Sequence, residues 1–236
     1  ALGGDNRTGV SALVTMIKTL FKNNIPHGPI TILFTVREES GLWGARMVKK
    51  EELGNPVRGY NIDGGPAEEI GTGAVGCDRW EAEIYGKAEH AGLAPEKGLS
   101  ASMIASLALS DAKNKGWFGK IVKEKKSGTS NIGIFGGKNG KSAGASPNTV
   151  CEYAYIKGES RSYDQDFVSE ITSAFEDSFK KVCNEYENSE GEKAQLIFKR
   201  HTDYYSFSIN ENEKVVSTTK DKVNKLGLTP KLVSIS

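Results

Sequence analysis

Residues 30–39 decide how the first part of the chain is expected to fold, and they read Ile-Thr-Ile-Leu-Phe-Thr-Val-Arg-Glu-Glu. The first seven are apolar or β-branched and do not alternate with polar residues, which predicts a strand covered on both faces, as in a parallel sheet. Helical spacing of apolar residues precedes it over 7–24. A shorter helix over 43–51 and a strand over 59–62 are expected after it. This helix–strand–helix–strand order predicts an α/β domain.

The pattern of elements changes further along the chain. Strands are expected over 79–86, 131–135, 149–159 and 193–200, with helices over 99–113 and 163–187. The order β-α-β-β-α-β predicts a split βαβ, ferredoxin-like layer. A helix over 211–226, capped by Gly227, and a strand over 231–236 are expected to follow.

Composition excludes several classes of protein. The 236 residues include 31 basic and 30 acidic side chains, a net charge of +1, whereas nucleic-acid binders carry a clear basic excess. The longest apolar stretch, residues 30–36, is far shorter than the ~20 residues that span a bilayer. Three widely spaced cysteines indicate neither a disulfide framework nor a thiolate zinc site. We therefore expect a cytoplasmic protein of one or two domains that binds neither nucleic acid nor membrane.

Four acidic residues stand where an α/β sheet places functional groups, just beyond the carboxyl ends of strands. Asp5 comes directly before the first helix, Glu38 and Glu39 follow the strand at 30–36, and Asp63 ends the strand at 59–62. Each has a structural alternative: a helix N-cap for Asp5, a helix N-terminus for the glutamates and a glycine turn for Asp63. Together, four carboxylates at one sheet edge would repel one another unless a divalent cation neutralised them.

Six motifs in the same order resemble one enzyme superfamily, the zinc aminopeptidases and aminoacylases that include peptidase T, carboxypeptidase G and desuccinylase. The motifs are Leu2-Gly-Gly-Asp-Asn-Arg-Thr-Gly9, Phe34-Thr-Val-Arg-Glu-Glu-Ser-Gly-Leu-Trp-Gly-Ala45, Asn61-Ile-Asp-Gly-Gly65, Gly86-Lys-Ala-Glu-His-Ala-Gly-Leu-Ala-Pro-Glu-Lys-Gly98, Ser146-Pro-Asn-Thr-Val150 and Gly158-Glu-Ser-Arg-Ser162. The peptidase T-like branch is the most similar. The resemblance implies an α/β zinc-exopeptidase catalytic domain with a mostly parallel sheet, and an inserted α+β ferredoxin-like lid or dimerisation domain.

The resemblance also implies roles for the four carboxylates. Asp5 would bridge two Zn²⁺ ions, with Co²⁺ or Mn²⁺ as alternatives, while Glu39 would bind one ion and Asp63 the other. Glu38, beside a ligand but not a ligand itself, would be the general base. A non-proline cis peptide between Asp5 and Asn6 is expected as well.

In the lid, His90 resembles the histidine that supports the oxyanion, often across a dimer. Asn148 and Arg161 resemble residues that bind the substrate's backbone or carboxylate. The alternatives are a solvated side chain for His90 and a surface ion pair with Glu159 for Arg161.

The resemblance implies two histidine ligands that this sequence does not supply. His27 lies in a loop before the predicted strand and His201 near the end of the lid, so neither suits a ligand position. We therefore expect a catalytic domain formed by 1–75 and 207–236, incomplete at both ends, with the lid at 76–206. Carboxylates alone are poor zinc ligands, which predicts weak zinc binding and no measurable peptidase activity for a polypeptide of this sequence alone.

The function that the resemblance implies is that of a dizinc metallopeptidase, an aminopeptidase of the tripeptidase type that acts on short peptides. The resemblance also implies a homodimer formed through the lid. A related amidohydrolase, either an N-acyl amino acid deacylase or a carboxypeptidase, would use the same metal chemistry with a different pocket. A catalytically silent homologue serving as a binding scaffold is a third reading. The presence of Glu38 argues against that reading, because a scaffold does not need a carboxylate that binds no metal.

Overall fold

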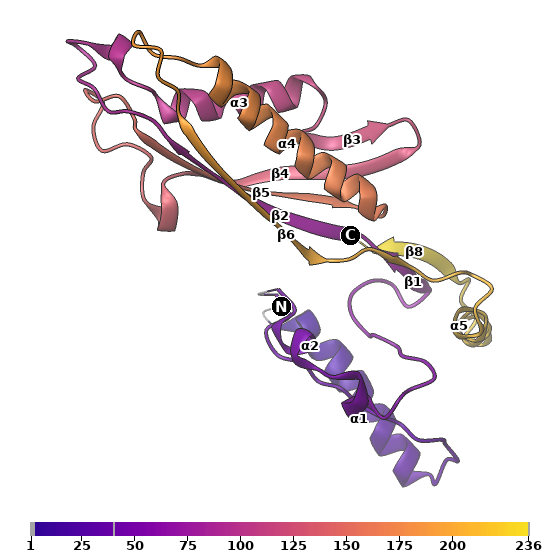
Figure 1. Ribbon diagram of the computed structural model, residues 1–236. Coiled ribbons are helices and arrows are strands. Elements are labelled where there is room, and N and C mark those ends of the chain that lie inside the picture. The colour runs from indigo at the N-terminus through magenta and orange to yellow at the C-terminus, as the bar shows by residue number, and fades with distance from the viewer. Residues whose placement is uncertain (1–2, 40, 236) are drawn as a thin grey trace. The chain divides into compact units, whose positions relative to one another are not determined.

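The computed structural model describes residues 3–39 and 41–235 (Figure 1). Leu2 and Ser40 of the motifs, and Ser236 of the last expected strand, lie outside the described residues. The chain divides into unit 1, residues 1–70 and 211–232, and unit 2, residues 71–210 and 233–236. The predicted assignment of a catalytic domain and a lid stays a prediction, because compactness alone does not assign a role.

Unit 2 contains a five-stranded antiparallel sheet with two long helices on one of its faces (Figure 1). Its elements are β2 (Gly76–Tyr85), α3 (Ala101–Asn114), β3 (Gly119–Lys123), β4 (Lys126–Gly136), β5 (Tyr153–Ser162), α4 (Gln165–Glu185) and β6 (Gln195–Tyr204). The sheet order is β3-β4-β5-β2-β6. Without β3, this is the spatial order of a split βαβ layer, so the ferredoxin-like prediction is confirmed.

The strand β3 was not predicted, and a cluster of charged residues connects it to β4. In the run Lys-Glu-Lys-Lys at residues 123–126, Lys123 ends β3 and Lys126 begins β4. The Lys123 ammonium lies over the Trp117 ring, 4.1 Å from its centroid. A lysine can expose its charge while its stem covers an apolar surface, so a charge run does not exclude a strand.

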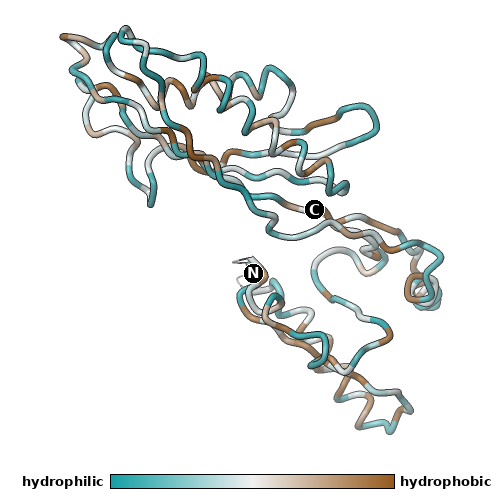
Figure 2. The backbone as a smooth tube through the Cα atoms, viewed as in Figure 1, coloured by the Kyte–Doolittle hydropathy of each residue, from teal (hydrophilic) through white to brown (hydrophobic). Residues whose placement is uncertain are grey.

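Sequence periodicity explains how unit 2 forms its core. The apolar stripe of α4 buries Phe167, Phe175 and Phe179 against the sheet, where Trp80 of β2 is fully buried. The Trp80 ring stacks on Phe175, with centroids 4.8 Å apart. Figure 2 shows hydrophobic residues along the middle of these strands. Burial of these large rings contributes most of the stabilisation that unit 2 obtains from its core.

Side-chain caps define where the two helices begin. Ser100 Oγ accepts a hydrogen bond from the Met103 N–H (3.3 Å) at the start of α3. Asp164 Oδ1 accepts one from the Phe167 N–H (3.1 Å) at the start of α4. Each cap satisfies a backbone donor that has no partner inside its own helix.

Unit 1 contains helices but not the strands expected for it. Its helices are α1 (Gly4–Lys22), α2 (Trp43–Met47), the 3₁₀ turn η1 (Lys50–Leu53) and α5 (Lys214–Lys225). The predictions of strands over 30–36 and 59–62 are wrong for this structure, since neither segment pairs with any other described residues. A segment forms a β-strand only when its backbone is hydrogen-bonded to a neighbouring strand. This holds even when the segment's own residues favour extended backbone.

A small sheet of three strands joins β1 (Glu69–Ala74), β7 (Phe207–Ser208) and β8 (Lys231–Ile235), in the order β7-β1-β8. The strand β8 was predicted. The strand β1, Glu-Ile-Gly-Thr-Gly-Ala, was not predicted, because its two glycines weaken the sequence pattern of a strand. With sheets and helices mixed in this way, the α/β class is confirmed. Across the described residues, no helix is long and apolar enough to cross a membrane.

Candidate active site

The backbone at the start of α1 is unusual at the first predicted metal ligand. Asp5 (φ −92°, ψ 110°) and Asn6 (φ −119°, ψ 58°) are not helical. The peptide bond between them is cis, as predicted. The Asp5 side chain is exposed and is therefore available to a ligand, rather than being used as a buried cap.

Asn6 and Gly9 hold the segment that carries Asp63 against α1. Asn6 Nδ2 donates to the Ile62 carbonyl oxygen (2.6 Å), and Asn6 Oδ1 accepts from the Gly9 N–H (2.9 Å). A Cβ atom at position 9 would overlap the same Ile62 oxygen. A residue without a side chain at position 9 therefore lets α1 approach the backbone beside Asp63.

Glu38 and Glu39 lie on a tight turn that leads into α2. The Glu38 carbonyl oxygen accepts from the N–H groups of Gly41 (2.9 Å) and Leu42 (2.8 Å). Gly44 approaches Val36 closely, since a Cβ there would lie 2.6 Å from the Val36 nitrogen. The turn presents both glutamates at the surface, where their side chains are exposed.

The electrostatics of Glu39 show that the carboxylates are close in space. The pKa of Glu39 is raised, chiefly by the negative charge of Asp5 and then by that of Glu38, with a smaller contribution from Asp63. A hydrogen bond between the Glu39 and Asp5 side chains acts in the same direction. Asp5, Glu38 and Asp63 therefore disfavour the ionised form of Glu39, and a cation among these groups would offset that repulsion.

The donor set fits a divalent cation in part. Within the described part of the chain, no three His, Cys, Asp or Glu side chains are grouped closely enough to hold a metal ion. The coupled groups Asp5, Glu39 and Asp63 offer oxygen donors only, whereas zinc favours nitrogen and sulfur. His27 is exposed, with Nδ1 2.8 Å from the Gly28 oxygen and its ring against Phe21, so it is not one of this set.

In unit 2 the structure brings His90 and Asn148 together. An isolated bridge pairs His90 with Thr149, the Ala91 N–H donates to the Asn148 carbonyl oxygen (2.9 Å), and the Val150 N–H donates to the Glu89 oxygen (2.9 Å). Both side chains are exposed. The two motifs are therefore parts of one surface.

Local hydrogen bonds orient the polar atoms of His90 and Asn148. The Gly92 N–H donates to His90 Nδ1 (3.1 Å), so the neutral ring carries its proton on Nε2. The Ser146 hydroxyl donates to Asn148 Oδ1, which leaves the amide NH₂ as the donor of that side chain.

Arg161 lies at the other end of the sheet from His90. In the antiparallel pairing of β5 with β2, Arg161 lies opposite Cys77, near the start of β2. Tyr153 lies opposite Tyr85, at the end of β2 that leads to His90. The eight steps along β5 from residue 153 to residue 161 span roughly 27 Å at about 3.4 Å each. The structure therefore does not bring Arg161 together with His90 and Asn148 inside one lid.

The surface ion pair considered as the alternative for Arg161 is formed. Its Nε lies 3.0 Å from Glu159 Oε1 and its Nη2 donates to Glu159 Oε2 (3.2 Å). The guanidinium has five donors, so this pair leaves several of them for a substrate carboxylate.

Sequence reasoning missed the residues that hold these segments in place. Asn6 has a local signal, because an Asn whose side-chain oxygen accepts from the helical N–H three residues later is a common capping pattern. Glu83 has none: it accepts from Lys138 Nζ (2.9 Å) and from the Tyr153 hydroxyl (2.8 Å), which lie at the two ends of the segment carrying Asn148. Lys138 and Tyr153 together lower the pKa of Glu83.

Comparisons with known proteins agree with these observations. Residues 72–187 match the peptidase dimerisation domain, and residues 3–72 match the M42 glutamyl aminopeptidases. The Bacillus subtilis protein YqjE is 34% identical over 227 residues, which are 96% of this chain and 56% of that protein. The chain belongs to the superfamily of peptidase T and carboxypeptidase G. Carboxypeptidase G2 of Pseudomonas sp. is 33% identical over 43% of this chain and 25% of its own length.

Two solved structures share nearly the whole fold of this superfamily member. The aminopeptidase PepT of Bacillus cereus superposes with a TM-score of 0.82 at 32% identity, and a tripeptidase of Staphylococcus aureus with 0.86 at 29%. Each comparison covers 99% of this chain and 57% of the solved chain. The chain thus spans a little over half the length of these relatives.

Proposed function

We propose that this chain forms part of a zinc-dependent peptidase that hydrolyses short peptides, an aminopeptidase of the tripeptidase type. The observation that carries the proposal is the hydrogen bond from Asn6 to the Ile62 carbonyl oxygen, which holds the backbone beside Asp63 against the start of the helix that carries Asp5. The charges of Asp5, Glu38 and Asp63 raise the pKa of Glu39 in agreement with it. Similarity to an aminopeptidase and a tripeptidase supports the reaction class. We assign residues 1–75 and 207–236 to the catalytic domain and 76–206 to the lid.

Three carboxylates would hold the metal: Asp5 between two zinc ions, Glu39 on one and Asp63 on the other. Bound zinc lowers the pKa of a water molecule to about 7 and polarises the scissile carbonyl. A cation bound by these carboxylates would offset the repulsion that raises the pKa of Glu39. These three donors are all oxygens. A zinc site formed by them would therefore also need imidazole ligands from other residues.

Glu38 would act as the general base. It lies beside Glu39 on an exposed turn, so its carboxylate can take a proton from water and return it to the leaving amine. Such proton transfer typically contributes about 10²–10⁴-fold to the rate.

The lid residues would act across a homodimer. The Nε2 proton of His90 and the NH₂ of Asn148 are donors on one surface, suited to the oxyanion and the substrate backbone. Arg161 lies roughly 27 Å from that surface along β5. One protomer would therefore supply Arg161 to its own site, and its partner would supply His90 and Asn148.

Glu38→Gln and Glu39→Gln test these roles in the complete protein supplied with zinc. We expect E38Q to keep its zinc content and to lose about 10²–10⁴-fold in kcat, because it removes a proton carrier but no ligand. E39Q should lose both zinc and activity. Glu51→Gln, an exposed glutamate of η1, is the matched control and should change neither. Equal zinc loss in E38Q and E39Q would contradict the assignment.

Similarity to carboxypeptidase G2 favours one second candidate, a carboxypeptidase using the same site. Tripeptides with a blocked amino end and tripeptides with a blocked carboxyl end distinguish the two. An aminopeptidase cleaves only the peptides whose amino end is free, and a carboxypeptidase only those whose carboxyl end is free. N-acyl amino acids, run in parallel, test for a deacylase.

A further inference from the structure

The loop that carries His90, residues 87–98, has little support of its own. Its base is closed by two backbone hydrogen bonds between Lys87 and Leu99, of 3.0 and 2.9 Å. Beyond the base it contains single turns, and Leu93 near its tip is 80% exposed. Its geometry must therefore depend on contacts from another part of unit 2.

Some of those contacts come from residues 148–150, described above. Others come from a turn at residues 188–192, between α4 and β6. Asn188 Nδ2 donates to the Lys97 carbonyl oxygen (2.8 Å), and the Ser189 N–H donates to the Glu96 oxygen (2.8 Å). Both bonds reach the C-terminal end of the His90 loop. They connect residues about ninety positions apart in the chain.

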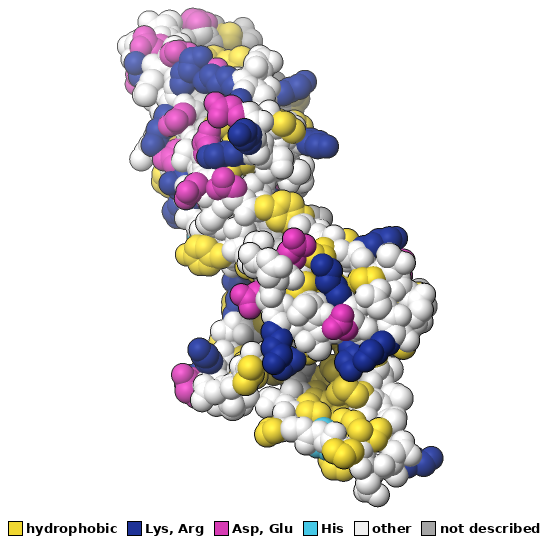
Figure 3. Space-filling model, turned by 90° about the vertical axis from the view of Figure 1, so that its right-hand side faces the viewer, with side chains coloured by type: hydrophobic (Ala, Val, Ile, Leu, Met, Phe, Trp, Pro, Cys, Tyr) yellow, Lys and Arg dark blue, Asp and Glu magenta, His cyan; other side chains and the backbone are white. Residues whose placement is uncertain are grey.

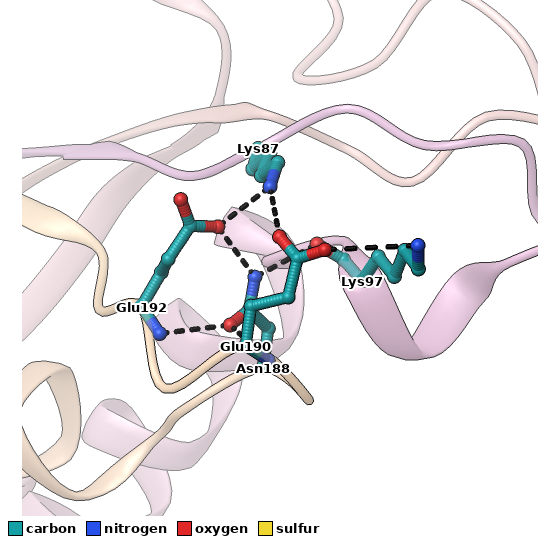
Figure 4. Close-up of polar contacts among 5 residues, drawn as sticks. All are labelled: Lys87, Lys97, Asn188, Glu190 and Glu192. Carbon is teal, nitrogen blue, oxygen red and sulfur yellow. Dashed lines mark hydrogen bonds and ion pairs between the residues drawn. The ribbon is translucent and has the colours of Figure 1, made fainter.

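The same turn binds the N-terminal end of the His90 loop through charge (Figure 4). Lys87 Nζ lies 2.8 Å from Glu190 Oε2 and 2.6 Å from Glu192 Oε2. Glu190 also reaches Lys97, with Oε1 3.7 Å from Lys97 Nζ. The carboxylate of Glu190 thus lies between the lysines at the two ends of the loop.

Asn188 builds the turn so that both glutamates face Lys87. Its Oδ1 accepts from the N–H groups of Glu190 (3.0 Å) and Glu192 (2.8 Å), and its Nδ2 donates to Glu192 Oε2 (2.8 Å). Gly191, with φ +76°, provides the left-handed residue between them. Lys87 in return lowers the pKa of both carboxyl groups.

We propose that Lys87 and the 188–192 turn form a clamp that positions the His90 loop. Lys87 is a positioning residue in this assignment, because it acts through the loop and not on substrate. The catalytic consequence rests on the proposed function, in which His90 supports the oxyanion. The structural consequence, which is that the loop is ordered, does not rest on the proposed function.

Hydrogen exchange of the chain tests the clamp without any activity measurement. We expect Lys87→Met to speed exchange of amides 88–97 by about 5–10-fold while the amides of α3 and α4 keep their rates. Lys87→Arg should restore protection. Lys193→Met is the matched control, because it breaks a 2.9 Å ion pair with Glu187 in the same hairpin without touching the loop.

Added salt provides a second readout in the same experiment. Screening of exposed charges should speed exchange of the loop in the wild type and in the Lys193→Met variant, but not in Lys87→Met. Unchanged exchange at 88–97 in Lys87→Met would overturn the proposal. A uniform increase over all of unit 2 would overturn it as well, since that result means general destabilisation.

Kinetics then connect the clamp to His90. We expect Lys87→Met to lower kcat by about tenfold with KM within twofold, because a displaced oxyanion donor affects the transition state more than binding. An unchanged kcat, where His90→Ala is severely impaired, would overturn the catalytic part. These kinetics use the complete protein. A complete protein without peptidase activity would contradict the proposed function alone, and the exchange result would still decide on the clamp.

Discussion

Trp80 of unit 2 and Trp43 of unit 1 are the same side chain in opposite surroundings. Trp80 is fully buried between Phe175 and Phe198, whereas Trp43 is 51% exposed beside Arg37. Among the described residues of unit 1, the buried ones are Gly9, Val216 and Val223. Unit 2 therefore buries a set of large aromatic and aliphatic side chains in one core, whereas the described residues of unit 1 bury only a glycine and two valines.

The difference shows where each unit finds partners for its apolar faces. In unit 2, helices α3 and α4 and the sheet that they cover come from one continuous segment. In unit 1, large apolar side chains remain exposed, among them Val10, Val14, Phe21, Leu33, Phe34 and Val36. Figure 3 shows such side chains at the surface between charges of both signs. An amphipathic stripe stabilises a fold only when something covers it.

The largest expected effect is that of Trp80→Ala. Loss of the buried ring should lower the free energy of unfolding of unit 2 by about 3–5 kcal/mol, because the cavity cannot close around it. Trp43→Ala is the matched variant in unit 1 and should cost less than about 1 kcal/mol. Urea unfolding followed by circular dichroism measures both. Equal costs would contradict the comparison.

Gly9→Ala should come next, and it tests the one buried position of α1. The new Cβ would overlap the Ile62 carbonyl oxygen and push the Asp63 segment away, at a cost of about 1–3 kcal/mol. Gly4→Ala has open space around it and serves as the control in the same helix. Faster exchange of amides 60–64 in Gly9→Ala only is the expected result. Similar exchange in both variants would show that the close approach is dispensable.

Asp111→Asn tests an ion cluster that joins α3 to α4. Lys115 (2.6 Å), Lys181 (2.9 Å) and the Ser178 hydroxyl (2.8 Å) bind the Asp111 carboxylate and lower its pKa. A lowered pKa means that the stabilisation is present above the ordinary value of about 3.9 and is lost as the pH falls through the folded-state value.

The expected cost of Asp111→Asn is therefore about 1–2 kcal/mol at pH 7, and the difference from wild type should shrink below pH 4. Urea unfolding at pH 7 and pH 3 measures it. Lys180→Met, which breaks an exposed pair with Glu176, should cost less than about 0.5 kcal/mol at either pH. A pH-independent cost for Asp111→Asn would exclude the charge as its origin.

Phe34→Ser should have the smallest effect. The side chain is 53% exposed in unit 1, so replacing it should change the free energy of unfolding by less than about 0.5 kcal/mol. The same measurement on Phe175→Ser in unit 2 provides the contrast, with an expected cost of several kcal/mol. A large cost for Phe34→Ser would mean that unit 1 has a core that exposure does not reveal.

The sequence by itself determined the elements whose signals are local. The 3–4 spacing of Phe167, Ile171 and Phe175 predicts α4, and the alternation over 79–86 predicts the strand β2, because each pattern spans only a few neighbouring residues. The cis peptide between Asp5 and Asn6 followed from the motif that contains it. The roles of the four carboxylates, His90, Asn148 and Arg161 remain predictions.

Tertiary structure alone decided the features that join distant parts of the chain. Residues 30–36 have strand composition and yet form no strand, because a ladder requires a neighbour that composition cannot supply. The Asn6 contact with Ile62 spans 56 residues and that of Lys87 with Glu190 spans 103, with no periodic signal at either end. The register of β2 against β5 places Arg161 at the opposite end of the sheet from His90. Such pairings depend on which distant segments become neighbours in the fold. Sequence patterns that span a few residues carry no information about that choice.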